Sequence, residues 1–511
     1  MKQQAMKSIA AKLTAIAVIA TWLLTGCSPV ANPDSANAAS KVTLQTFYNQ
    51  KVTWKDCGEK LVCGRISVPV NYAKPSQGTI KLAAVIYQGA GANKQGTLLM
   101  NPGGPGGSGY DFVKENPTSV GTANLRSHYD ILGFDPRGVG RSAGVKCLSA
   151  KETDKFIYSE SGYAIGSAKD LAHSKTMINK FIAACLKNTG SKMRYFDTVS
   201  TARDMDVMRA VMGDAKLNYL GFSYGTFLGN TYATLFPAKV GRMVLDGAID
   251  PTVPDNEQSV NQIAGFDKAL RAYMTDCYKL GQACPFSQPV DTGLAELKQW
   301  LRDLEGYPYD TKLNGRKLTI WGATTGIIMA LYSEDYWTYL TRAFQDIVTD
   351  EDGTVMLQLA DAYNERNADG TYGSNQMEAN IAISCMDGRS DASLSAMQAQ
   401  NARMIAASPT LGRYWQYGAV LCSKWPWPAI KAPKSYAATG SAPILVVGTT
   451  GDPATPYAQS VSLANDVLDN GHLVTYNGEG HTAYGRSNAC VSDAVDAYLI
   501  DGVVPTVDPD C

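Results

Sequence analysis

The chain has 511 residues, with 46 Lys and Arg against 47 Asp and Glu, and a formal net charge of -1. This balance excludes the basic surface typical of a nucleic-acid-binding protein and the acidic excess typical of a disordered one. The length suits one long α/β unit or about two to four ordinary domains. We therefore expect a neutral globular protein that acts on small or peptide-like partners and does not bind nucleic acid.

The first 26 residues have the composition of a bacterial signal peptide. Three lysines accompany a 12-residue apolar run, 13–24, which is too short to span a bilayer comfortably. A membrane anchor is the alternative. The run ends in Leu-Thr-Gly-Cys27, which resembles the lipobox and implies cleavage before Cys27 and lipidation of that cysteine. Residues 27–40, rich in Ala, Ser, Asn and Pro, then predict a flexible tether to the outer face of the cytoplasmic membrane.

Cysteine usage also predicts export. Setting Cys27 aside for the lipid leaves ten of the 11 cysteines, an even number that suits disulfides in an exported chain. Sequence alone does not determine the pairing. Closeness along the chain favours Cys57–Cys63, Cys277–Cys284 and Cys490–Cys511, and Cys147–Cys185 with Cys385–Cys422 would use the remainder. A zinc site is the alternative, but the close pairs have no paired histidine nearby, so we expect no metal.

The pattern of apolar runs predicts an α/β core in two parts, residues 41–250 and 441–511. The expected strands are 81–87, 97–100, 129–134, 218–222, 242–245, 443–448 and 472–477, and the expected helices include 225–236 and 489–499. A further helix should begin at Thr201, with Asp204 completing a capping box. Strands that alternate with helices predict a mainly parallel sheet with helices on both faces.

Residues 251–440 interrupt this pattern with helical stretches and long polar connections. The expected helices are 265–280, 292–304, 324–349 and 392–407. We interpret the segment as a mostly helical lid inserted before the final strands, where loops gather above a sheet. A separate C-terminal domain is the alternative, and the return of the core pattern after residue 440 argues against it.

Gly-Phe-Ser223-Tyr-Gly fits the G-x-S-x-G pattern of a nucleophile elbow. An apolar strand precedes it and a helix follows it, which is the context that this chemistry requires. The turn places Ser223 at a helix N-terminus, where backbone N–H groups favour negative charge. An ordinary glycine-rich turn is the alternative. We predict that Ser223 is the nucleophile of a serine hydrolase.

A serine nucleophile needs a base, and the base needs an orienting acid. Among the four histidines, His481 lies in a loop between the last strand and the last helix, where an α/β-hydrolase carries its base. Asp452 follows the preceding strand, so the chain order Ser223, Asp452, His481 is the one expected of that fold. Asp246 and Asp250 also follow a strand and are rivals for the role of the acid.

The loop 101–109, Asn-Pro-Gly-Gly-Pro-Gly-Gly-Ser-Gly, follows an early strand. Its glycines allow the backbone to approach a substrate oxygen, and a tetrahedral oxyanion needs two N–H donors. We predict that these are the N–H groups of Gly104 and Tyr224. A phosphate-binding loop is the alternative, but the G-x-x-x-x-G-K-[ST] pattern is missing. We therefore expect no cofactor.

Five motifs together resemble the secreted tripeptidyl aminopeptidases of actinobacteria, which are relatives of proline iminopeptidase within the α/β-hydrolases. They are Asn101-Pro-Gly-Gly-Pro-Gly, Asp135-Pro-Arg-Gly-Val-Gly-Arg-Ser142, Gly221-Phe-Ser-Tyr-Gly-Thr226, Gly451-Asp-Pro-Ala-Thr-Pro456 and Gly480-His481. The motifs occur in family order, and the resemblance covers essentially all of the mature chain. Esterases and epoxide hydrolases share parts of the set but usually begin the oxyanion loop with His-Gly. Here Pro102 takes the histidine position, as is common in the tripeptidyl branch.

The resemblance implies the release of short peptides, of three residues, from a free N-terminus through an acyl-enzyme. Such an activity needs a carboxylate in the lid to hold the substrate ammonium. Asp387, beside the bridge expected at Cys385, is the first candidate and Glu257 is the second. An ester hydrolase of the same fold and a non-catalytic envelope-binding lipoprotein are the alternatives. We expect a monomer whose partners are peptides with a free N-terminus and, through the lipid, the membrane.

Overall fold

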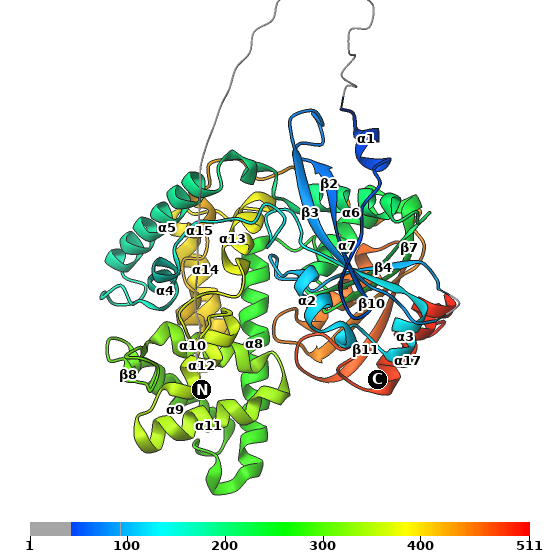
Figure 1. Ribbon diagram of the computed structural model, residues 1–511. Coiled ribbons are helices and arrows are strands. Elements are labelled where there is room, and N and C mark those ends of the chain that lie inside the picture. The colour runs from blue at the N-terminus through cyan, green and yellow to red at the C-terminus, as the bar shows by residue number, and fades with distance from the viewer. Residues whose placement is uncertain (1–41, 92–93) are drawn as a thin grey trace, which may run out of the picture. The chain divides into compact units, whose positions relative to one another are not determined.

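The computed structural model describes residues 42–91 and 94–511, so the signal peptide, Cys27 and the tether lie outside the described residues. A nine-stranded sheet has the order β1-β2-β3-β5-β4-β6-β7-β10-β11 (Figure 1). Its strands are β1 Lys55–Gly58, β2 Leu61–Pro69, β3 Thr79–Tyr87, β4 Thr97–Asn101, β5 Asp130–Phe134, β6 Leu217–Phe222, β7 Val240–Asp246, β10 Ile444–Gly451 and β11 Gly471–Glu479. From β5 to β11 the strands are parallel, and β1, β2 and β3 extend one edge in antiparallel pairing. The predicted mainly parallel sheet is confirmed, and the edge strands β1 and β2 are an addition.

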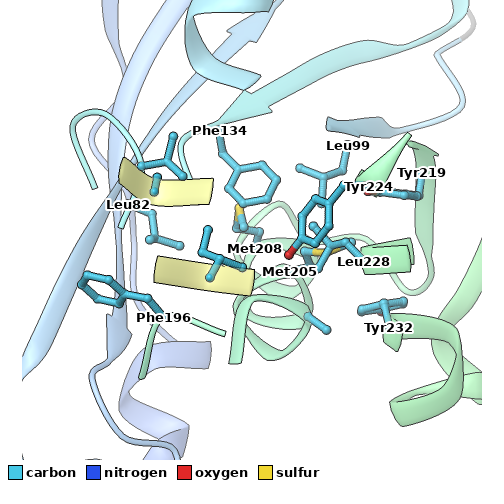
Figure 2. Close-up of a cluster of buried hydrophobic side chains, with 14 of the residues drawn as sticks. Leu82, Leu99, Phe134, Phe196, Met205, Met208, Tyr219, Tyr224, Leu228 and Tyr232 are labelled. Atoms are coloured by element: carbon cyan, nitrogen blue, oxygen red, sulfur yellow. The ribbon is translucent and has the colours of Figure 1, made fainter. Parts of the chain in front are cut away.

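Alternate residues of the strands face opposite sides of the sheet, as the two-residue period of a strand requires. In β3, Leu82 and Ala84 join one buried cluster, whereas Ala83 and Val85 join another. The first face is covered by α6 Thr198–Val211 and α7 Tyr224–Leu235, whose buried side chains include Met205, Met208, Leu228 and Tyr232 (Figure 2). The second face is covered by α2 Gly109–Glu115, α3 Ala123–His128 and α17 Ala489–Asp496. Both faces of the sheet are therefore buried, which explains why the central strands have continuous apolar sequences.

The helix predicted to begin at Thr201 begins three residues earlier. Asp197 is its N-cap, and the Asp197 carboxylate accepts the N–H of Ser200 at 2.6 Å. Thr201 lies inside the helix, with its hydroxyl donating to the carbonyl of Asp197 at 2.9 Å. Asp204 does not complete a capping box, because it is buried against Arg137. A polar run offers several capping positions, and the tertiary ion pair decided between them.

Residues 251–440, interpreted above as a lid, are mostly helical. Their helices are α8 Asp255–Cys277, α9 Val290–Leu304, α10 Ile320–Leu331, α11 Trp337–Asp350, α12 Thr354–Tyr363, α13 Gln376–Asp387, α14 Leu394–Ala407 and α15 Val420–Ser423, beside a hairpin of β8 Tyr309–Asp310 and β9 Lys317–Leu318. The stretch 324–349, expected as one helix, is divided between α10 and α11 by a short turn. These helices bury a core of their own, which includes Phe266, Leu297, Ile327 and Phe344.

Two helices from the range 41–250 contact the lid. In α4 Ala150–Tyr158, Tyr158 belongs to the buried cluster of the lid and donates its hydroxyl to Asp361 at 2.9 Å. In α5 Ala168–Asn188, Leu171 packs with Met397 and Val420. The range 41–250 therefore includes helices that contact the lid, and the apolar pattern of a helix does not show what the helix packs against.

All five expected disulfides are present: Cys57–Cys63, Cys147–Cys185, Cys277–Cys284, Cys385–Cys422 and Cys490–Cys511. Their formation uses these ten cysteines and excludes a zinc site made from them. The last bridge holds the C-terminal residue beside the edge strand β11, where the Cys511 N–H donates to the carbonyl of Thr475 at 2.9 Å. The disulfides agree with an exported protein. Among residues 42–91 and 94–511, no helix is both long and apolar enough to cross a membrane.

A buried ion pair fixes the motif 135–142 against α6. The Nε and Nη2 atoms of Arg137 lie 2.7 and 2.6 Å from the two carboxylate oxygens of Asp204, and both side chains are fully buried. The hydroxyl of Tyr72 donates to the same carboxylate at 2.7 Å. The motif therefore has a structural role in joining the sheet to a helix.

Replacing Arg137 with Met should leave the Asp204 carboxylate buried without its partner and cost about 3–5 kcal/mol of unfolding free energy. Urea or thermal unfolding measures this change. Lys279→Met is the matched control, because Lys279 pairs with Asp276 on the surface, and it should change the free energy by less than about 0.5 kcal/mol. Equally small changes in both variants would contradict a stabilising role of the buried pair.

Candidate active site

The turn at the end of β6 holds Ser223 in a strained backbone conformation. Ser223 has φ 56° and ψ −125°, a region that residues other than glycine rarely adopt. Its N–H donates to the carbonyl of Asp246 at 2.9 Å, and the N–H and hydroxyl of Thr226 donate to its carbonyl at 2.8 and 2.6 Å. Ser223 is partly exposed at the N-terminus of α7. This is the geometry of a nucleophile elbow.

The loop 101–109 lies directly against this turn. A Cβ on Gly103 (φ 99°) would lie 2.9 Å from the Cβ of Ser223, so only glycine permits the approach. The Gly103 N–H is already used, because it donates to the side-chain oxygen of Asn101 at 3.0 Å. In the described part of the chain, the N–H groups of Gly104 and Tyr224 have no hydrogen-bond acceptor. The two predicted oxyanion donors are therefore available.

Asp452 contacts His481 through both carboxylate oxygens, each 2.9 Å from Nδ1. The Asp452 side chain is buried and also accepts the N–H groups of Ala454 and Thr455 at 2.9 and 2.8 Å and the Thr455 hydroxyl at 3.0 Å. Because a carboxylate accepts, the contact places the imidazole proton on Nδ1 and leaves Nε2 as the basic nitrogen. Among the described residues Ser223 Oγ makes no hydrogen bond, and such catalytic bonds commonly close only when substrate binds.

The rival acids belong to other networks. Asp246 accepts the N–H groups of the second and third residues after His481, at 3.0 and 2.8 Å. Burial raises the pKa of Asp246 to about 6. Asp250 accepts nearby hydroxyl groups and does not contact the imidazole. The geometry therefore favours Asp452 as the orienting acid and gives Asp246 the role of holding the histidine loop.

Tyr332 of the lid contacts the histidine directly. The N–H of His481 donates to the Tyr332 carbonyl at 2.8 Å, and the two rings meet edge to face with centroids 5.4 Å apart. The Tyr332 ring also packs on Tyr363 at 6.0 Å. Sequence reasoning missed this residue, since no motif surrounds it. Thr455 was also missed, although it lies within the motif of Asp452.

Asp387 lies at the end of α13, close to the elbow. The N–H and hydroxyl of Thr198 donate to its carboxylate at 2.8 and 2.6 Å, and the Thr198 hydroxyl also bonds the hydroxyl of Tyr224 at 2.5 Å. Burial, followed by the nearby charge of Asp197, raises the pKa of Asp387 to about 8. In the part of the chain that the structure describes, no Lys, Arg or His forms an ion pair with Asp387. Its carboxylate therefore lacks a cationic partner near the candidate nucleophile.

The second candidate for amine binding, Glu257, is corrected by the structure. Arg403 binds both of its carboxylate oxygens at the surface, so Glu257 has no free charge to offer an ammonium group. Asp255, two residues earlier on α8, lies closer to the first candidate, because a Cβ on Gly388 would lie 2.3 Å from the Asp255 carboxylate. Burial raises the pKa of Asp255 as well. The sequence did not show that Glu257 meets Arg403 or that Asp255 is the acid of this turn that lies beside Gly388.

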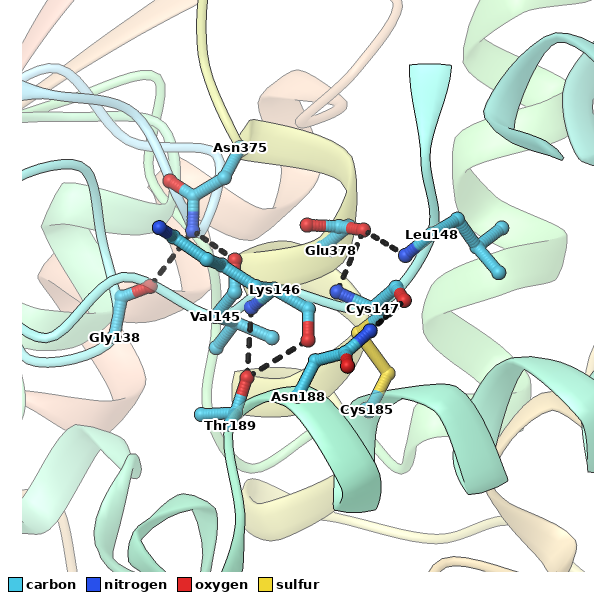
Figure 3. Close-up of a disulfide and its surroundings, with 10 residues drawn as sticks. All are labelled: Gly138, Val145, Lys146, Cys147, Leu148, Cys185, Asn188, Thr189, Asn375 and Glu378. Atoms are coloured by element: carbon cyan, nitrogen blue, oxygen red, sulfur yellow. Dashed lines mark hydrogen bonds between the residues drawn. A yellow bond between two sulfur atoms is a disulfide. The ribbon is translucent and has the colours of Figure 1, made fainter. Parts of the chain in front are cut away.

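Helix α13 connects Asp387 with the oxyanion loop. The Nδ2 of Asn380 donates to the carbonyl of Pro105 at 3.1 Å. At the start of the helix, Asn375 and Glu378 bind the backbone of the segment 138–148, next to the disulfide shown in Figure 3. Both ends of the connection are thus fixed, so the distance from the carboxylate to the loop is set by a rigid helix.

Known proteins resemble this chain over nearly its whole length. Residues 408–511 match the family described as TAP-like protein. Serine protease Hip1 of Mycobacterium tuberculosis is 34% identical, covering 98% of this chain and 96% of the relative. Carboxylesterase B of the same species is 36% identical, covering 97% of each. Tripeptidyl aminopeptidase of Streptomyces coelicolor is 30% identical, covering 90% and 86%. The chain belongs to the TAP-like family of serine hydrolases, with an α/β-hydrolase core.

Proposed function

We propose that this protein is a serine exopeptidase that releases tripeptides from substrates with a free N-terminus. The observation that carries the proposal is the carboxylate of Asp387, which has no cationic partner within residues 42–91 and 94–511 and is held by α13 near the oxyanion loop. A buried carboxylate with a raised pKa gains most from a cationic ligand, because the ligand replaces the lost hydration of its charge. The names of two relatives, a serine protease and a tripeptidyl aminopeptidase, support the same activity.

The spacing along α13 supports the release of three residues. Asp387 follows Asn380 by seven residues on one helix, which is about 10 Å. Asn380 serves as the reference point for the oxyanion loop, because its side chain donates a hydrogen bond to the Pro105 carbonyl in that loop. Three residues of extended chain also span about 10 Å. A peptide whose ammonium binds Asp387 would thus present its third carbonyl to Gly104.

The proposed reaction uses the triad in the usual order for an acyl-enzyme. His481 Nε2 takes the proton of Ser223 as Oγ attacks the carbonyl carbon, and Asp452 stabilises the resulting imidazolium. The N–H groups of Gly104 and Tyr224 bind the oxyanion. The intermediate collapses as His481 delivers the proton to the departing amine. Water then repeats the attack on the acyl-enzyme, which releases the peptide acid and restores the serine.

An ester hydrolase of the same fold is the second candidate. It is favoured by the relative named carboxylesterase B, which is 36% identical. An ester substrate needs the same triad but no carboxylate for an ammonium group. The function of Asp387 therefore distinguishes the two candidates.

Asp452→Asn should lower kcat for a small ester by about 10⁴-fold, because an amide in this place favours the wrong imidazole tautomer. Initial rates of ester hydrolysis measure this change. In a separate experiment, Ser223→Ala should abolish labelling of the protein by a fluorophosphonate probe. Asp250→Asn removes the rival acid and is the control, with an expected loss of less than about tenfold. A comparable loss in the two aspartate variants would overturn the assignment of Asp452.

Asp387→Asn should lower kcat/KM for free-amine tripeptide anilides by about 10- to 100-fold, the effect of one charge-assisted hydrogen bond. The N-acetylated anilide and the ester should lose little, because they carry no ammonium. Asp391→Asn, which removes an exposed carboxylate from the loop after α13, is the matched control. Equal losses on amine and acetylated substrates would contradict amine binding and favour the esterase.

The pH dependence of kcat/KM is a second test of amine binding by Asp387. Asp387 binds an ammonium only when ionised, so kcat/KM for free amines should rise as the pH approaches its pKa of about 8. Above that pH the substrate amine loses its own proton, with a pKa of about 7.7–8.0, and kcat/KM should fall. The profile for free amines should therefore be a narrow bell near pH 8. The Asp387→Asn variant should lack its rising limb near pH 8.

We also propose that Cys27 carries a lipid that holds the enzyme at the outer face of the cytoplasmic membrane. The lipobox-like sequence before Cys27 supports this, and these residues lie outside the described part of the chain. Globomycin, which inhibits the lipoprotein signal peptidase, should make the uncleaved precursor accumulate on an immunoblot. Unchanged processing would contradict lipidation.

A further inference from the structure

A cavity of about 600 Å³ opens beside the oxyanion loop. On the core side it is lined by Gly103, Gly104 and the helix α2. On the lid side it is lined by the end of α12 and by the following residues, up to Gln376 of α13. Its volume lies within the range of sites that hold ligands. Since two of its walls belong to the oxyanion loop and the lid, it adjoins the position of the reacting carbonyl.

The end of α12 connects this cavity to the histidine of the candidate triad. His481 must deliver its proton to that amine, and the contacts from His481 through Tyr332 to Tyr363 lead to the end of α12. Tyr363 stands between the cavity-lining residues Asp361 and Glu365. The amine-binding carboxylate is eleven residues beyond Gln376 on α13, which is about 16 Å away along the helix. Asp387 and the cavity thus lie at opposite ends of α13.

Five ionisable side chains line this cavity, and four of them are acidic. Three of the five are already in ion pairs: Asp111 with Arg141 at 2.8 Å, Asp361 with Arg316 at 2.8 Å, and Arg366 with Asp154 at 2.7 Å. The other two, Glu115 and Glu365, are exposed and have no ion-pair partner among the described residues. Glu115 lies on the core wall and Glu365 on the lid wall, so each wall carries an exposed carboxylate.

We propose that this cavity binds the part of the peptide that follows the scissile bond, and that Glu115 and Glu365 select leaving peptides with Lys or Arg. The inference rests on the proposed exopeptidase function and adds a preference on the leaving side. The carboxylates act as specificity residues at the rim, where they attract basic side chains that remain partly hydrated.

The test compares peptides that share their first three residues and continue with Lys-Lys, Ala-Ala or Glu-Glu. The kcat/KM for tripeptide release is measured by liquid chromatography and mass spectrometry. Wild type should prefer Lys-Lys over Ala-Ala by about tenfold, as two exposed charge contacts allow, and Glu-Glu should be the poorest. High salt should reduce the preference, because exposed charges are screened.

The double variant Glu115→Gln and Glu365→Gln should bring the Lys-Lys to Ala-Ala ratio close to one. Because the ratio is taken within one variant, a general loss of activity does not affect it. Glu59→Gln with Glu351→Gln is the matched control, since both are exposed, unpaired carboxylates away from the cavity, and this pair should keep the wild-type ratio. Tripeptide release without a basic preference in wild type, or an unchanged ratio in the double variant, would overturn this inference and leave the exopeptidase standing. Cleavage of esters alone would overturn both.

Discussion

Asp246 joins the two halves of the candidate triad, and the remaining geometry depends on it. Its carbonyl accepts the N–H of Ser223, which holds the strained turn, and its carboxylate accepts two N–H groups just after His481. One residue at the end of β7 thus sets the nucleophile turn and the histidine loop relative to each other. A buried carboxylate is costly unless it is hydrogen-bonded, and here that bonding also places the base. A residue first considered as a rival acid therefore has a positioning role.

Two buried carboxylates of the site, Asp452 and Asp387, differ in the hydrogen-bond donors that surround them. Asp452 is buried but surrounded by donors from the turn 452–455 and from the imidazole, so its charge is satisfied within the protein. Asp387 is desolvated, Thr198 is its only hydrogen-bond donor in the described part of the chain, and its pKa is raised to about 8. The first arrangement suits a permanent anion that orients a base. The second suits an anion that is completed by a ligand, which is why the proposed function assigns the substrate ammonium to Asp387 and not to Asp452.

The lid contributes to the site as much as the sheet does. Tyr332 accepts the N–H of His481, Asn380 bonds the oxyanion loop, and Asp387 faces the elbow through Thr198. The sheet and its loops supply the reacting groups, which could serve any acyl transfer. Helix α13 is tied to the loop 138–148 at one end and carries a carboxylate at the other. In the proposed function, its length sets the distance between the two ends of the released peptide. Substrate choice in the proposed function thus lies mainly in the inserted helices.

The sequence by itself determined the local chemistry: the elbow around Ser223, the chain order of the triad and the apolar strands. These features depend on neighbours in the chain or on patterns with a fixed period, which a sequence displays directly. Tertiary structure alone decided that Asp387 has no cationic partner among the described residues while Glu257 is bound by Arg403. It also decided that Asp204 is buried with Arg137 and that α4 and α5 contact the lid. Each of these outcomes depends on which partner a side chain meets across the fold. Such partners are far apart in the chain, and no local pattern records them.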